Sequence, residues 1–149
     1  ITAGPVEIEF PTLLDFPAPK LKVYSIETAI AEKFEAIVSL QLQTSRMKDF
    51  YDILFFAEHY NFKKETLIQA ITTTFNNRST DLESSKAIFE VKFKKNERFQ
   101  NLWKAFLDRN KLENDKTFSE VVAQIQSFIQ PVFDSETNNN WNPNKWKWE

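Results

Sequence analysis

The sequence predicts a mainly α protein, a bundle of about five helices preceded by a short extended or β segment. Apolar residues recur every three or four positions from residue 26 to residue 130, which is the period of helices that bury one face. Near the N-terminus, alternation typical of a half-buried strand replaces this period, and three prolines exclude a helix there. These two patterns divide the chain into an extended segment (1–25), a helical domain (26–133) and a C-terminal tail (134–149).

The composition excludes several kinds of site. The chain has 149 residues and a single glycine, where an average domain of this length carries roughly ten. Dinucleotide-binding fingerprints, P-loops and Gly-x-Ser-x-Gly nucleophile elbows each need at least two glycines. The absence of cysteine and the single histidine exclude zinc sites built from those residues. The net charge of −2 does not by itself indicate a nucleic-acid partner.

The apolar runs also bear on location. None approaches the eighteen residues that suggest a membrane span, and no secretory signal opens the chain. We therefore expect one cytoplasmic domain with no membrane partner. Because the chain begins with an isoleucine and its only methionine is Met47, we expect it to be a fragment, a processed product or a trimmed chain.

Three helices are expected in the first half of the helical domain. The first begins after Ser25, a good N-cap, has Glu27 in its first turn and runs to about residue 42. A polar break precedes a second helix over about 46–59, and a turn at residues 61–62 leads into a third over about 63–76.

The second half is less regular. Residues 77–85 are polar, and the alternation in residues 87–93 suggests an extended piece. Asn96 is expected to cap the next helix, and Thr117 with Glu120 forms a capping box for the last, which ends at Pro131. The tail that follows carries three tryptophans and is expected to dock on the body of the protein.

Charged residues occupy the face of two helices that should be buried. At about 100° per residue, Lys33 falls within about 20° of Ile26, in the middle of the first apolar stripe, whereas Glu32 and Glu35 point to the opposite side. In the second helix, Arg46 and Asp49 lie in the apolar arc and Asp52 lies on its edge. An antiparallel pair of helices would bring Lys33 close to Asp49.

Buried charges of this kind need partners, because an unpaired buried charge costs several kcal/mol or more. One interpretation is a structural ion pair that fixes how the two helices pack. The other is a functional cleft, where perturbed ionisable groups gather. On the residues alone, both interpretations remain open.

Three segments of the chain resemble a known family. They are Phe10-Pro11-Thr12-Leu13-Leu14-Asp15, Tyr24-Ser25-Ile26-Glu27-Thr28-Ala29-Ile30-Ala31-Glu32-Lys33-Phe34-Glu35-Ala36 and Ser45-Arg46-Met47-Lys48-Asp49-Phe50-Tyr51-Asp52-Ile53. They resemble the AbiE-type abortive-infection toxins, the AbiEii/AbiGii family of nucleotidyltransferases. The resemblance extends over the whole chain and is strongest over residues 5–60.

The resemblance implies a bacterial enzyme of a type IV-like toxin–antitoxin and phage-defence pair. Such an enzyme transfers a nucleotide from an NTP, with Mg²⁺, to an acceptor such as tRNA. It implies catalytic roles for Lys33, which contacts the nucleotide phosphates, and Asp49, which assists the acceptor. Arg46, Lys48 and Asp52 are candidate substrate-binding residues, and Arg46 has the alternative role of pairing with Asp49.

One part of the family pattern is missing. The family's polymerase-β-like core carries a Gly-Ser turn and an Asp-x-Asp pair that hold metal and nucleotide, and neither occurs in this sequence. We do not assign the metal site to Glu7 and Glu9, because no Gly-Ser turn precedes them. We therefore expect the C-terminal, helical portion of such an enzyme, with residues 1–25 as a remnant of the core. We expect it to bind neither Mg²⁺ nor NTP, and to be inactive, on its own.

Two further clusters have both a functional and a structural interpretation. A basic run could contact nucleic-acid phosphates, although a solvated face is the favoured interpretation (Lys86, Lys92, Lys94, Lys95 and Arg98). Trp141, Trp146 and Trp148 could stack on bases, although docking of the tail is favoured. The alternative function for the whole chain is a non-catalytic helical module that binds an antitoxin or nucleic acid.

Overall fold

The fold is that of a computed structural model, which describes residues 25–133 and 139–149. Within these ranges it contains six α-helices: α1 (Ile26–Leu40), α2 (Met47–His59), α3 (Lys64–Asn77), α4 (Val91–Lys94), α5 (Glu97–Arg109) and α6 (Phe118–Ile129). Three 3₁₀ segments follow or connect them: η3 (Gln41–Gln43), η4 (Leu82–Phe89) and η5 (Gln130–Phe133). The prediction of a mainly α fold is confirmed; the extended segment expected before Ser25, with Glu7 and Glu9, lies outside the described residues.

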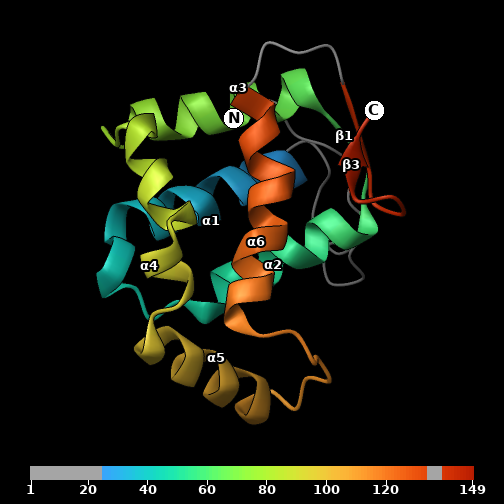
Figure 1. The fold of residues 1–149 in the computed structure, drawn as a ribbon. Coiled ribbons are helices and arrows are strands. Elements are labelled where there is room, and N and C mark those ends of the chain that lie inside the picture. Colours follow the sequence, from blue (N-terminus) through green and yellow to red (C-terminus); the bar gives the residue numbers. More distant parts are fainter. Residues whose placement is uncertain (1–24, 134–138) are drawn as a thin grey trace, which may run out of the picture.

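Helix α1 lies in the middle of the molecule, behind α6 in the view of Figure 1. It packs most extensively against α3 and α2. Ile30, Phe34 and Ile37 are almost completely buried, and so is Glu35 on another side of the helix. The helix is therefore enclosed on more than the one face that its apolar stripe indicated.

The predicted helix ends agree with the capping residues that the structure shows. The side chain of Ser25 accepts a hydrogen bond from the Thr28 amide at 3.0 Å, and Asn96 accepts one from the Phe99 amide at 3.1 Å. The capping box of Thr117 and Glu120 is formed in both directions. The first helix is shorter than expected, because the chain tightens into η3 after Leu40.

The prediction of an extended segment over residues 87–93 is wrong. Residues 82–89 form η4 and residues 91–94 form α4. The alternation of apolar and polar residues gave the wrong prediction because the apolar Val91 is exposed, while Ile88 and Phe93 lie in the core. Helical turns pair most of their backbone groups locally, so this segment needs no neighbouring strand to satisfy them.

The C-terminal tail completes a small antiparallel sheet at one side of the bundle (Figure 1). Its strands are β1 (Phe62–Lys63), β2 (Asn140–Asn142) and β3 (Lys147–Trp148), in the order β1-β2-β3. Trp141 faces Phe62 on one side and Trp148 on the other in the strand register. Residues 62–63, at the end of the expected turn, thus form a strand, because the tail supplies its partner.

The tryptophans of the tail pack on the body of the protein. Trp141 and Trp148 are buried, and their indole N–H groups donate to the carbonyls of Ala57 and Phe128, both at 2.8 Å. The expected docking of the tail is confirmed for the described residues. None of the helices in the described part of the chain is long and apolar enough to span a membrane.

Candidate functional site

Lys33 extends from α1 to the first turns of α2. Its Nζ lies 2.8 Å from Asp52 Oδ2 and 3.7 Å from Asp49 Oδ1, and 26% of its side chain is exposed. The predicted proximity of Lys33 and Asp49 is therefore confirmed. The shorter contact, however, is with Asp52, one helical turn further along α2.

Asp49 is the buried member of this cluster. Only 4% of its side chain is exposed, and Arg46 Nε lies 2.8 Å from its Oδ2. That oxygen nevertheless makes no hydrogen bond of good geometry, so the contact with Arg46 is close but poorly aligned. Two cations thus compensate this carboxylate without fully satisfying it.

The environment of Asp49 changes its acidity. Burial raises the pKa of the Asp49 carboxyl above its ordinary value, while the positive charges of Arg46 and Lys33 act in the opposite direction. The nearby Asp52 carboxylate adds to the rise in this pKa. The net direction is upward, so Asp49 holds a proton more readily than an exposed aspartate.

All five predicted site residues belong to one ion-pair network. Asp52 Oδ2 forms an ion pair with Lys33 and accepts a hydrogen bond from Lys48, whose Nζ lies 2.6 Å away. Arg46 and Lys48 are mostly exposed, whereas Asp52 is largely covered. The two carboxylates of the network are therefore covered, and Arg46 and Lys48 are exposed at its edge. These residues come from α1 and the start of α2.

A hollow of about 410 Å³ lies beside this network. Its floor and walls are formed by Ala29, Glu32, Lys33, Ala36, Arg46 and Arg78. Of the predicted residues, Lys33 and Arg46 line it, whereas Asp49, Lys48 and Asp52 do not. Two cations of the predicted cluster thus line the hollow, whereas its carboxylates do not.

One residue that lines the hollow, Arg78, was not predicted from the sequence. Arg78, the residue after α3, binds Glu35 at 2.9 Å and Glu32 at 3.1 Å. Glu35, which the helical wheel put on the side of α1 away from its apolar stripe, is buried there, whereas Glu32 lines the same hollow as Lys33. No local pattern marks Arg78, because its partners are more than forty residues away in the sequence.

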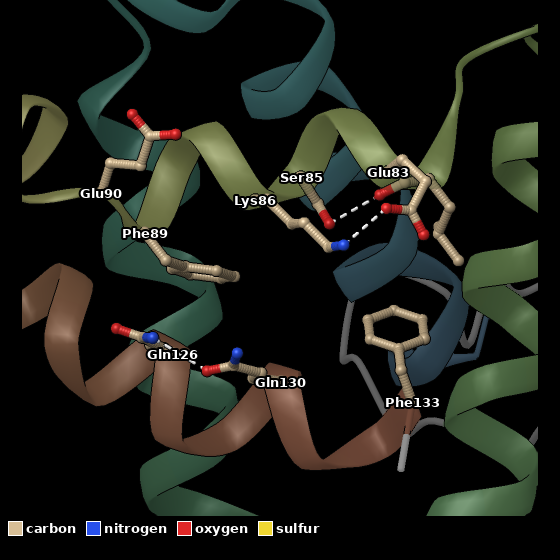
Figure 2. Close-up of a pocket in the computed structure, with 9 residues that line it drawn as sticks. Glu83, Ser85, Lys86, Phe89, Glu90, Gln126, Gln130 and Phe133 are labelled. Atoms are coloured by element: carbon tan, nitrogen blue, oxygen red, sulfur yellow. Dashed lines mark hydrogen bonds and ion pairs between the residues drawn. The ribbon is translucent and has the colours of Figure 1, made fainter.

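A second hollow of about 370 Å³ lies between η4 and the α6–η5 segment. Figure 2 shows the rings of Phe89 and Phe133 facing it, with Glu83 and Lys86 joined to each other above them. Gln126 and Gln130 are also hydrogen-bonded to each other. Lys86 is the one cation among the described residues that line it, so this hollow lacks the converging cations of the first one.

The remaining candidates have structural contacts. Arg98 donates to the carbonyls of Leu42 and Thr44, and Lys94 donates to Gln126. His59 ends α2, where its ring stacks on Phe55 and its Nδ1 lies 2.8 Å from the Phe55 carbonyl. The contacts of Arg98 and Lys94 agree with the structural interpretation favoured for the basic run.

The described residues do not fit a metal cage. No group of three or more His, Cys, Asp or Glu in residues 25–133 and 139–149 is arranged to hold a metal ion. Asp49 and Asp52, the two carboxylates of the network, already contact Lys33, Arg46 and Lys48.

The fold and this cluster define a class: a helical protein in which two adjacent helices bring a lysine and two aspartates together, with the lysine lining a hollow. Comparison with known families gives the specific relationship. Residues 1–124 match the family described as nucleotidyl transferase AbiEii toxin, type IV toxin–antitoxin system. The chain belongs to this family of nucleotidyltransferase toxins. Searches of curated proteins and of solved structures returned no match.

Proposed function

We propose that this chain is the helical part of a nucleotidyltransferase toxin that transfers a nucleotide from an NTP to an RNA acceptor such as tRNA. The observation that carries the proposal is the convergence of Lys33, Asp49 and Asp52 beside the hollow, in a member of a nucleotidyltransferase family. A cognate antitoxin is the expected protein partner. The enzyme would act in bacterial phage defence.

In this reaction the acceptor hydroxyl oxygen attacks the α-phosphorus of the NTP. The bond to the bridging oxygen breaks, pyrophosphate leaves, and the hydroxyl proton passes to a base. Negative charge grows on the phosphate oxygens, and a fixed cation stabilises it best in a partly enclosed site. Lys33, held by two carboxylates at the edge of the hollow, is suited to this role.

We assign Asp49 to the acceptor hydroxyl. Its raised pKa makes its carboxylate a stronger base than an exposed aspartate. Arg46 covers one of its oxygens, but its own side chain is 57% exposed and has room to turn toward the phosphates. Lys48 and Asp52 would then hold Lys33 and the substrate from the α2 side.

Metal chemistry would come from other residues. When bound, Mg²⁺ would supply the positive charge that stabilises the phosphates and activates the nucleophile. The 149 residues contain neither the Gly-Ser turn nor the Asp-x-Asp pair that the family uses to hold it. We therefore propose that transfer needs residues beyond this segment, and that these 149 residues alone transfer no nucleotide.

The test is a transfer assay with labelled NTPs and tRNA, using the product of the complete gene. We expect Lys33→Ala and Asp49→Asn to reduce transfer at least about a hundredfold, in line with the loss of a charge-stabilising or acid–base group. Their melting temperatures should stay close to that of the wild type. Lys86→Ala is the matched control, because Lys86 pairs only with Glu83 on an exposed surface.

Two results would contradict the proposal. Lys33→Ala or Asp49→Asn could retain full transfer, or both could lose stability of several kcal/mol, which would identify a structural ion pair. Transfer by the 149 residues alone would overturn the assignment of the metal site to other residues.

The second candidate is a non-catalytic module that binds the antitoxin or nucleic acid. It is favoured by the observation that every charge in the network already has a partner within the protein. This alternative would be supported if the complete gene product carrying Lys33→Ala transferred nucleotide with normal activity.

A further inference from the structure

Arg78 lines the same hollow as Lys33 and Arg46, and the proposed reaction gives it no role. It follows the last residue of α3, and 44% of its side chain is exposed. Lys33, Arg46 and Arg78 are the three cations that line the hollow, each from a different element or connection. Three cations around one space of this size suit a ligand with several negative charges.

Arg78 is held from behind by a buried carboxylate. Its Nη1 donates to Glu35 Oε1 at 2.9 Å, and the hydroxyl of Thr80 donates to Glu35 Oε2 at 2.6 Å. Both oxygens of Glu35 are thus engaged, and the carboxylate cannot turn without losing one of these bonds. The guanidinium is therefore positioned before any ligand arrives, which reduces the entropic cost of binding.

The floor of the hollow exists because two of its residues are alanines. Ala29, Glu32, Lys33 and Ala36 follow the i, i+3, i+4, i+7 spacing of one helical face of α1. The two methyl groups leave space at either end of Lys33. A larger side chain at position 29, which is only half-buried, would extend into that space.

Among the described residues that line the hollow, Glu32 is the one that is acidic. Its carboxylate lies 3.1 Å from Arg78 Nη2 and is 38% exposed. An exposed ion pair of this kind contributes little to stability, typically about 0–1 kcal/mol. Glu32 is therefore free to be displaced by an anion that binds the same guanidinium more strongly.

We propose that Arg78 is the third cation of a triphosphate-binding cradle with Lys33 and Arg46, and that Glu32 occupies Arg78 until the phosphates displace it. The proposal rests on the proposed function for Lys33 and extends it to a new residue. A guanidinium has five N–H donors, and Arg78 donates one hydrogen bond to Glu35 and one to Glu32. Displacement of Glu32 would release the Nη2 donor, which could then act with another free N–H as a forked pair for phosphate oxygens.

The cradle makes predictions of opposite sign for neighbouring residues. The probe is inorganic tripolyphosphate, titrated calorimetrically into the purified protein at low salt with EDTA, so that no metal contributes. Arg78→Gln combined with Glu35→Gln removes the cation without leaving a buried charge unpaired. We expect it to weaken binding about tenfold, the equivalent of one charge-assisted hydrogen bond.

Glu32→Gln should have the opposite effect and strengthen binding about three- to tenfold, because it removes the competing carboxylate. Ala29→Leu should weaken binding by filling the floor, although it changes no charge. Lys86→Gln is the control for a general loss of positive charge and should bind as the wild type does. Circular dichroism of each variant checks that its helices are retained.

The outcomes separate this inference from the proposed function. If Lys33→Gln weakens tripolyphosphate binding while the Arg78 and Glu32 variants match the wild type, the role of Arg78 is overturned and that of Lys33 stands. If the Arg78 and Glu32 effects appear but Lys33→Gln has none, Arg78 binds phosphate under the control of Glu32, but the phosphate role of Lys33 and the three-cation cradle both fail. Absence of binding by the wild-type protein, or an equal loss in Lys86→Gln, would overturn the cradle.

Discussion

At the scale of single residues, Asp49 shows how a charge can remain in a buried position. Its carboxylate is compensated by Lys33 and Arg46, yet one oxygen has no well-aligned hydrogen bond. The helical wheel predicted its proximity to Lys33. It did not predict that Asp52 would make the shorter contact, because that depends on how the two helices cross.

The raised pKa of Asp49 predicts a pH dependence of stability. Between the ordinary aspartate pKa of about 3.9 and the raised pKa of Asp49 in the folded protein, the folded state retains the Asp49 proton that the unfolded chain has lost. The contribution of Asp49 to the free energy of unfolding therefore falls as the pH rises through its folded-state pKa. Asp49→Asn should lack this decrease.

The measurement is urea unfolding of the wild type and Asp49→Asn at several pH values from about 4 to 7. The difference in unfolding free energy should shift in favour of Asp49→Asn as the pH rises. Asp108→Asn, a change at an exposed position on α5, is the control. A difference between the wild type and Asp49→Asn that does not vary with pH would contradict the raised pKa.

At the scale of elements, indole N–H groups join the C-terminal tail to two helices of the bundle. Trp148 donates to the carbonyl of Phe128 near the end of α6, and Trp141 donates to that of Ala57 near the end of α2. Carbonyls in the last turn of a helix have no partner within it. The tail thus satisfies helix ends at the same time as it covers the core.

Replacing one of these tryptophans should separate the two effects. Trp148→Phe keeps an aromatic ring but leaves the Phe128 carbonyl unsatisfied in a buried site, and should lower the free energy of unfolding by about 1–3 kcal/mol. Trp146→Phe is the matched control, because Trp146 is only half-buried and its hydrogen bond is 3.3 Å long. Equal losses in the two variants, measured by urea unfolding, would show that the hydrogen bond of Trp148 is not the cause.

At the scale of the whole molecule, the described helices and the tail share one hydrophobic core. Trp141 and Trp148 belong to the same buried cluster as Phe34 of α1 and Phe128 of α6. Residues that share a core lose their packing together when it is exposed. The sequence-based division into a helical domain and a tail therefore does not imply two independent units.

This shared core predicts a single unfolding transition. Thermal melts followed by near-ultraviolet dichroism, which reports tryptophan packing, and by far-ultraviolet dichroism, which reports helices, should have the same midpoint. Three of the four tryptophans lie in the tail, so the first signal reports mainly on its docking. An earlier transition in the near ultraviolet would show that the tail detaches before the helices unfold.

The sequence by itself determined the fold class, the capping residues and the positions of the charges on α1 and α2, because these follow from the helical repeat. Its error at residues 87–93 arose where the local alternation did not match the side chains that tertiary packing buried. Only the tertiary structure decided that Lys33 contacts Asp52 most closely, that Glu35 is buried and that Arg78 lines the hollow. A repeat fixes where a side chain points on its own helix, whereas the meeting of Arg78 and Glu35, 43 residues apart, depends on how α1 and α3 pack.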